Sequence, residues 1–137
     1  MKTFLSLAIM AFASVMGITG AAQAEEAAAK PKLVAFHSDT CGSCKILGPK
    51  VEKALNAVNP NAVEFIKLDF TNEATKTASL NLAQEKGIAA AQKQFGTKTG
   101  IAVLVDANGQ VVEKFTKSSD DSYIAASMVR VILAPQS

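Results

Sequence analysis

The sequence predicts an α/β domain with a mixed sheet of about four strands and helices on both faces. Two fully apolar runs, residues 33–36 and 101–105, have the length and composition of strands that are buried on both faces. An Asn-Gly pair at residues 108–109 lies between two runs of β-branched residues and is typical of a hairpin. The segments between the strands have helical spacing or are rich in helix formers. Because parallel strands are joined by crossovers, we expect helices on both faces.

The domain is expected to open with the strand at residues 33–36 and a long helix. A polar turn at residues 38–40 supplies turn and cap chemistry after the strand. Apolar and small residues then recur at helical spacing over residues 44–58. Pro49 lies inside this stretch and is expected to kink the helix rather than end it. The Asn-Pro-Asn sequence at residues 59–61 ends the helix.

The later elements continue the alternation of strand and helix. Residues 63–70 have a partly alternating strand pattern. Residues 72–87 are rich in Ala, Leu, Lys, Glu and Gln, which favour a helix, and a second short helix is expected at residues 88–94. The last three expected elements are a strand at residues 101–105, a strand at residues 110–116, and a helix at residues 120–133 that follows a Ser/Asp cap.

The first 24 residues have the pattern of a secretory signal peptide. Lys2 is the only charge, residues 3–20 form an uncharged run, and Ala-Gln-Ala precedes two glutamates. A basic start, an apolar stretch and a small-x-small ending predict cleavage after Ala24. The alternative is an uncleaved membrane anchor, although the run is only just long enough to span a bilayer. We therefore expect a periplasmic protein with a polar lead-in at residues 25–32 and one domain at residues 33–137.

The composition excludes several classes of function. A net charge of +2 over 137 residues is too small to indicate a nucleic-acid-binding protein. Two cysteines exclude a disulfide-rich scaffold and a four-cysteine zinc site. A single histidine excludes any metal site that needs two imidazoles, and no glycine-rich phosphate loop follows a strand.

The two cysteines form the motif Cys41-Gly42-Ser43-Cys44, where the first strand turns into the first helix. In an oxidising compartment such a pair is expected to form a disulfide. A purely structural disulfide across this short loop would contribute only roughly 2 kcal/mol, so that alternative is less favoured. A helix N-terminus stabilises a thiolate, and a second cysteine two residues on is typical of cysteines that attack disulfides.

These observations assign different roles to the two cysteines. The small residues between them leave Cys41, expected in the first helical turn, open to a partner protein as the nucleophile. Cys44 is one turn further in, points toward the strand, and suits the role of resolving cysteine. Lys45 adds weak electrostatic stabilisation to the Cys41 thiolate, and Asp39 opposes it.

From Leu33 to Pro49 the chain resembles the thioredoxin superfamily position by position, through a strand, a Cys-x-x-Cys motif and a kinked helix. Residues 100–112 resemble the closing hairpin of the same family. The resemblance implies a thioredoxin-like fold and thiol–disulfide exchange, in which Cys41 attacks and Cys44 resolves the mixed disulfide. It implies protein thiols or disulfides as partners, and no cofactor besides the redox-active Cys41–Cys44 disulfide.

Three departures from the family pattern bear on function. Ala102 stands where the family has a cis-proline, and a cis bond before another residue costs roughly 2.5–4 kcal/mol. We therefore expect a trans Ile101–Ala102 peptide and a changed ledge for the substrate chain at these two residues. Ala35 replaces a buried carboxylate that assists the resolving cysteine in the family. His37 and Thr40 replace the aromatic residues that flank the motif.

His37 also defines an alternative function. As a polar residue at a strand end it can simply form a hydrogen bond. It can also tune the Cys41 thiolate, or join Cys41 and Cys44 around Cu(I), a soft ion that such ligands suit. That reading predicts an exported copper metallochaperone. A binding module with a vestigial motif is a third hypothesis, and the reactivity of Cys41 at neutral pH separates it from an enzyme.

The motif fits an oxidase, a reductase or an isomerase, because these roles differ in reduction potential rather than in residue pattern. Outside the cytoplasm a reductase needs electrons that cross the membrane. We therefore expect a membrane electron donor or acceptor beside the protein thiols or disulfides. We expect a monomer and no nucleic-acid partner.

Overall fold

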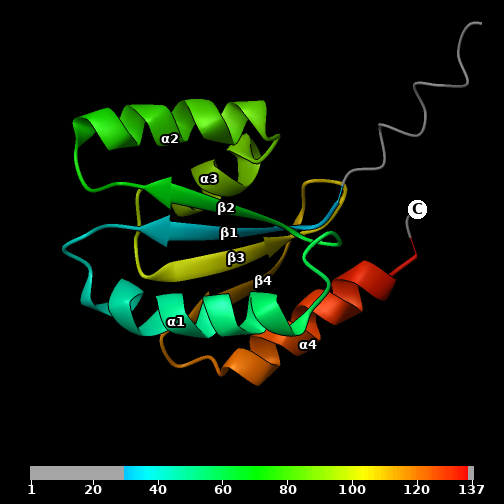
Figure 1. The fold of residues 1–137 in the computed structure, drawn as a ribbon. Coiled ribbons are helices and arrows are strands. Elements are labelled where there is room, and N and C mark those ends of the chain that lie inside the picture. The colour runs from blue at the N-terminus through cyan, green and yellow to red at the C-terminus, as the bar shows by residue number, and fades with distance from the viewer. Residues whose placement is uncertain (1–29, 136–137) are drawn as a thin grey trace, which may run out of the picture.

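A four-stranded mixed sheet lies between two layers of helices in the computed structural model, which describes residues 30–135 (Figure 1). The elements in chain order are β1 (Lys32–His37), α1 (Gly42–Ala57), β2 (Glu64–Asp69), α2 (Glu73–Glu85), α3 (Ala89–Phe95), β3 (Ile101–Val105), β4 (Val111–Thr116) and α4 (Asp121–Leu133). The strand order is β2-β1-β3-β4, with β1 and β2 parallel and the other neighbours antiparallel. The predicted α/β class and mixed sheet are confirmed.

The predicted signal peptide, residues 1–24, lies outside the described residues. The predicted polar lead-in at residues 25–32 overlaps the sheet, because β1 begins at Lys32. Over residues 30–135 no helix has the length and apolar character needed to cross a membrane.

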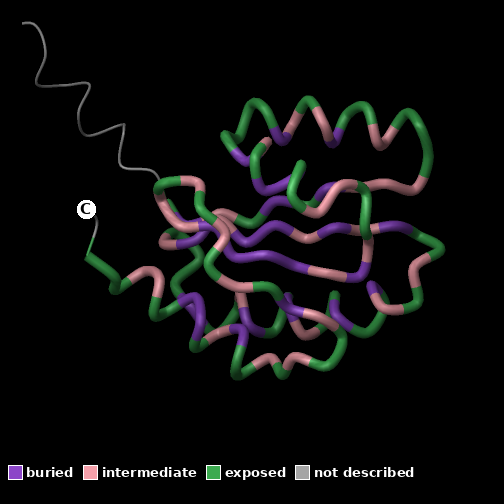
Figure 2. The backbone as a smooth tube through the Cα atoms, turned by 180° about the vertical axis from the view of Figure 1, so that it is seen from behind, coloured by how far each residue is buried: buried purple, intermediate pink, exposed green. Residues whose placement is uncertain are grey.

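Separate hydrophobic clusters fill the two sides of the sheet. Leu33 packs on the side of α1 and α4, whereas Val34 and Phe36 pack on the side of α2 and α3. Figure 1 shows these helix pairs on opposite faces. Because β1 and β3 are the inner strands, both of their faces are largely buried (Figure 2), which explains their continuous apolar sequences.

Helix starts are where sequence prediction and structure differ most. The N-cap of α1 is Cys41, whose Sγ accepts a hydrogen bond from the N–H of Cys44 at 3.2 Å. The cap expected from residues 38–40 is therefore wrong, and Cys41 precedes the first helical turn. Asp120 is the N-cap of α4, but its side chain makes no capping hydrogen bond. The helix α1 continues through Pro49 to Ala57, so the prediction that Pro49 does not end it is confirmed.

The predicted hairpin joins β3 to β4 as an antiparallel pair. Gly109 has a φ of +83°, which a residue with a side chain rarely adopts, and its N–H donates to the carbonyl of Asp106 at 3.1 Å. The Asp106 carboxylate accepts from the N–H groups of Asn108 and Gln110. The Asn-Gly signal therefore located the turn correctly.

Strand pairing brings three chain segments to one edge of the sheet. His37 pairs with Asp69 at the ends of β1 and β2, and the N–H of Phe70 donates to the carbonyl of His37 at 2.8 Å. The antiparallel β3 begins at the same edge, where Ile101 lies opposite Phe36. The loop before α1, the loop after β2 and the start of β3 therefore meet beside the cysteine pair.

Candidate functional site

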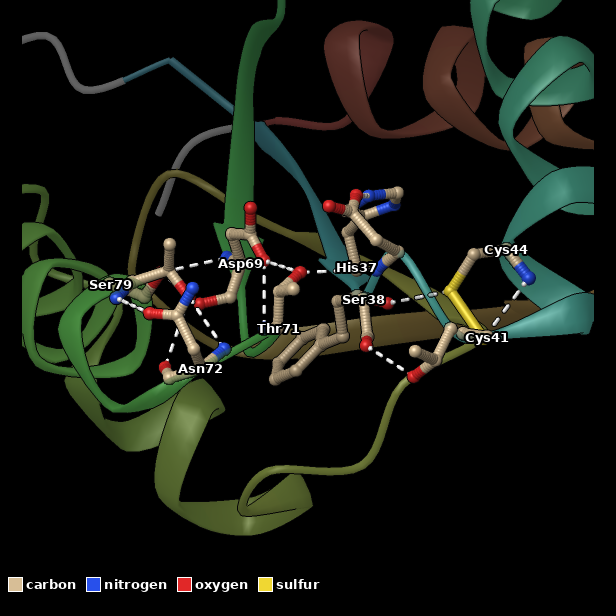
Figure 3. Close-up of polar contacts among 12 residues, drawn as sticks. His37, Ser38, Cys41, Cys44, Asp69, Thr71, Asn72 and Ser79 are labelled. Carbon is tan, nitrogen blue, oxygen red and sulfur yellow. Dashed lines mark hydrogen bonds and ion pairs between the residues drawn. A yellow bond between two sulfur atoms is a disulfide. The ribbon is translucent and has the colours of Figure 1, made fainter.

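Cys41 and Cys44 form a disulfide at the N-terminal end of α1, with their Cα atoms 5.3 Å apart (Figure 3). Cys41 is partly exposed, whereas Cys44 is buried and only 8% exposed. This agrees with the predicted positions of an outer and an inner cysteine. Because an incoming sulfur must reach the sulfur it attacks, Cys41 is the accessible end of the disulfide.

The surroundings of the two sulfurs favour different protonation states after reduction. The N–H of Cys44 points at Cys41 Sγ, and the positive end of the α1 dipole lies at the same place. Both favour a thiolate on Cys41. Cys44 Sγ lies 3.6 Å from the carbonyl oxygen of Phe36, to which a reduced thiol can donate. Burial and this carbonyl favour the neutral thiol on Cys44.

Gly100 borders the disulfide from the start of β3. Its φ is +81°, and its N–H donates to the carbonyl of Phe36 at 3.0 Å. A Cβ placed on Gly100 would lie 2.7 Å from the Cβ of Ser43 and 3.2 Å from Cys41 Sγ. Sequence reasoning used Gly100 only as part of the closing hairpin and missed it as a site residue. A glycine directly before a buried strand was the available signal.

The predicted substrate ledge, Ile101 and Ala102, lies at the start of β3, and its role stays a prediction. The Ile101–Ala102 peptide is trans as predicted, since no cis peptide bond occurs among residues 30–135. Ile101 is partly buried at the edge of the site. The side chain of Ala102 is fully buried in the cluster below α1 and α4, so it does not face a substrate. Gly100, which precedes these two residues, is also buried and packs against Ser43 and Cys41.

The other motif residues lie on the surface around the cysteines. Gly42 is exposed and has open space around the position of a Cβ, and Ser43 is partly exposed. Lys45 and Pro49 are exposed on α1. The surface of the motif and of this side of α1 is therefore open to solvent.

His37 forms a hydrogen bond with Asp39, whose charge is expected to oppose the Cys41 thiolate. Its Nε2 lies 3.0 Å from Oδ1 of Asp39. Among the residues that the structure describes, no group of three or more His, Cys, Asp or Glu side chains is arranged to hold a metal ion. The copper alternative stays a prediction. Anaerobic Cu(I) titration of the reduced protein and of its His37→Ala variant tests it.

The loop after β2 contributes residues that sequence reasoning missed. Thr71 Oγ1 accepts from the N–H of Asp39 at 3.1 Å and donates to Asp69 Oδ1 at 2.5 Å. The Thr71 hydroxyl lowers the pKa of Asp69, and this effect outweighs the opposing effect of burial. The polar sequence at the end of a strand was the only signal for this contact.

A groove of about 500 Å³ lies between α1 and β2, beside the inner cysteine. His37 and Cys44 border one end of it, and Phe65, 45% exposed, lines it from β2. The groove exists because β2 is an edge strand whose α1-facing side is only partly covered. The inner sulfur is therefore buried next to a hollow rather than inside a continuous core.

Comparison with known proteins adds to this geometry. The thioredoxin family model matches residues 18–93, which include the strand β1, the Cys-x-x-Cys motif and all of α1. The chain belongs to the thioredoxin family. This confirms the resemblance found in the sequence and makes the chain a member of a disulfide oxidoreductase family that carries the Cys-x-x-Cys pair. Gly100 and Ala102 lie beyond the matched residues.

Curated relatives of this thioredoxin-family chain are mitochondrial thioredoxins. Those of Bos taurus and Mus musculus are each 32% identical to it over 102 residues, or 74% of this chain and 52% of the relative. The chain therefore spans about half the length of the curated relatives it matches.

Solved structures share the fold of this thioredoxin-family chain at low sequence identity. A thiol:disulfide interchange protein from Chlorobium tepidum TLS has a TM-score of 0.54 and 14% identity, covering 80% of this chain and 84% of the other. A thiol-disulfide isomerase from Corynebacterium glutamicum has a TM-score of 0.55 and 16% identity, covering 82% and 86%. These likenesses show that the predicted thioredoxin-like fold is correct.

Proposed function

We propose that this protein is a thiol–disulfide oxidoreductase that exchanges disulfides with protein substrates through Cys41 and Cys44. The asymmetry of the disulfide carries this proposal. Cys41 is the accessible sulfur, at a helix N-terminus and beside a glycine, while Cys44 is buried against a backbone carbonyl. A disulfide that only stabilised the fold would need no such difference between its two sulfurs.

The oxidised protein can take two electrons from a substrate dithiol. A substrate thiolate attacks Cys41 Sγ, the bond to Cys44 breaks, and Cys44 leaves with the electron pair and takes up a proton. The second substrate thiolate attacks the substrate sulfur of the mixed disulfide and releases Cys41 as a thiolate. The substrate becomes a disulfide and the protein a dithiol. The reverse sequence, which starts from the Cys41 thiolate, reduces a substrate disulfide.

The site geometry assists both directions of this exchange. The N–H groups at the start of α1 stabilise negative charge on Cys41, so its thiolate is both available as a nucleophile and a good leaving group. Gly100 lets the start of β3 pack directly against the motif, because a Cβ there would lie 2.7 Å from the Cβ of Ser43 and 3.2 Å from Cys41 Sγ, so it helps to hold the cysteines in place.

We further propose that the protein acts in the periplasm. The signal-peptide pattern of residues 1–24 supports this location, and an oxidising compartment suits a protein whose cysteines cycle through a disulfide. Protein thiols or disulfides would be its substrates, and a membrane electron donor or acceptor would restore it after each turnover. Mass spectrometry of the exported protein should find an N-terminus at Glu25, whereas retention of Met1 would contradict export by cleavage.

Two cysteine variants test the activity against each other. Cys44→Ser should trap a mixed disulfide between Cys41 and a substrate protein, because the resolving thiol is gone. Cys41→Ser, which makes the same sulfur-to-oxygen change, should trap none and lose exchange. If Cys41→Ser reduces or oxidises a test protein disulfide at the wild-type rate, the proposal is wrong. The reduction potential then gives the direction of the exchange, about −120 mV for an oxidant and about −270 mV for a reductant.

A further inference from the structure

The loop that leads to Cys41 is joined to the loop after β2 by a chain of side-chain hydrogen bonds. The N–H of Asp39 donates to Thr71 Oγ1 at 3.1 Å, and this hydroxyl donates to Asp69 Oδ1 at 2.5 Å. The N–H of Thr71 donates to the same Asp69 oxygen at 2.9 Å. Figure 3 shows Thr71 between Asp69 and the loop that follows His37. We call Asp39, Thr71 and Asp69 the loop clamp.

The clamp is anchored to the helical layer above the sheet. Ser79 of α2, which is only 5% exposed, donates to the carbonyl of Asp69 at 2.9 Å and accepts from its N–H at 2.7 Å. Because the Thr71 hydroxyl also lowers the pKa of Asp69, that carboxylate is charged at neutral pH. A charged acceptor makes the stronger type of hydrogen bond, so Asp69 holds Thr71 firmly.

The charge that the clamp controls is the Asp39 carboxylate, two residues before Cys41. Its side chain is 74% exposed, and its Oδ1 is bound to His37 Nε2. The free N–H groups and the dipole at the start of α1 attract an aspartate in this part of the chain. There the carboxylate would compete with Cys41 Sγ for the same donors, and its charge would destabilise the thiolate.

We propose that Thr71, supported by Asp69, is a positioning residue for the exchange reaction. It fixes the backbone of residue 39 so that the carboxylate stays on His37 and the helix N-terminus stays available to the Cys41 sulfur. This inference rests on the proposed function and adds residues outside the motif to it. A negative charge moved to about 6 Å from a thiolate in water shifts the equilibrium between thiolate and thiol by a factor of about three toward the thiol.

Valine in place of Thr71 tests this role, because it keeps the shape of threonine and removes the hydroxyl. In the reduced Thr71→Val protein, iodoacetamide should alkylate Cys41 about threefold more slowly at pH 7. The equilibrium with glutathione should move about threefold toward the disulfide, which corresponds to a potential about 14 mV more negative. Thr71→Ser keeps the hydroxyl and should match the wild type. Asp69→Asn weakens the anchor and should shift both readouts in the same direction.

A second set of variants, made in Asp39→Asn, separates the effect of the Asp39 charge from a general loosening of the loop. In Asp39→Asn the carboxylate is absent, so adding Thr71→Val should change neither the alkylation rate nor the potential. Equal effects of Thr71→Val with and without Asp39→Asn would overturn the positioning role, as would no effect in either. If wild-type Cys41 exchanges disulfides while Thr71→Val behaves normally, only this inference fails. If wild-type Cys41 shows no exchange, the proposed function is wrong, and the inference that rests on it is wrong as well.

Discussion

Replacing Gly100 by alanine should damage both the fold and the exchange reaction, because one methyl group meets two separate obstacles. The first is the backbone, since a φ of +81° is unfavourable for any residue with a Cβ. The second is space, since the new Cβ would lie 2.7 Å from the Cβ of Ser43, where carbon atoms normally pack at about 3.5–4.0 Å. Ser43 lies between the two cysteines, so relief of this contact must move the motif.

The two obstacles can be given separate magnitudes. A left-handed conformation costs an alanine roughly 1–2 kcal/mol relative to glycine. Overpacking by one carbon in a fixed environment costs roughly 1–3 kcal/mol. We therefore expect Gly100→Ala to lower the free energy of unfolding by about 2–5 kcal/mol. Because displacement of Cys41 by a fraction of an ångström misaligns the reacting sulfurs, the exchange rate should fall by about tenfold or more.

Gly87 provides the matched control for this prediction. Its φ is +70°, and no atom lies within 4 Å of the position of its Cβ. Gly87→Ala therefore carries the backbone cost alone, and the difference between the two variants in urea unfolding isolates the contact with Ser43. Adding Ser43→Gly to Gly100→Ala removes the Cβ of Ser43 and should recover the part of the stability that this contact costs. Equal losses of stability in Gly100→Ala and Gly87→Ala, with exchange unimpaired, would refute the reasoning.

Three other predictions concern stability. The Thr71 hydroxyl lowers the pKa of Asp69, so its stabilisation is complete above about pH 4, near the ordinary aspartate pKa, and is lost as pH falls through the lower folded value. Urea unfolding between pH 5 and pH 3 should therefore be less pH-dependent in Asp69→Asn, and an unchanged slope would contradict this. Leu33 is fully buried, so Leu33→Ala should cost about 2–5 kcal/mol, and a loss below 1 kcal/mol would show that the core collapses around it. Lys50 Nζ donates to two carbonyls in the loop before α4, so Lys50→Met should cost about 1–2 kcal/mol, while the exposed Lys45→Met should cost nothing measurable.

The elements of the fold could be predicted because their signals are local. The continuous apolar run at residues 33–36 reports a strand buried on both faces, and β1 proves to be an inner strand with a different cluster on each side. The helix-forming composition of residues 72–87 likewise located α2 to within two residues. The cysteine pair was readable for the same reason, since its chemistry depends on a spacing within one helical turn.

The residues that complete the site could not be predicted, because they are brought together by strand pairing. Thr71 binds Asp39 across 32 positions only because His37 and Asp69 are partners in the parallel register. Gly100 reaches Ser43 only because β3 pairs with β1 in the opposite direction. The capping role of Cys41 was missed for a different reason, since a sulfur is not among the usual capping groups.

The placement of β1 in the middle of the sheet also has a consequence for the order of folding. Both of its partners come later in the chain, β2 from residue 64 and β3 from residue 101. During synthesis the two cysteines are therefore present long before either neighbouring strand, and such long-range pairing forms slowly. In that interval Cys41 and Cys44 are ordinary thiols of an open chain, accessible to every oxidant nearby. Their distinct reactivities arise only when the second half of the sequence docks against the first.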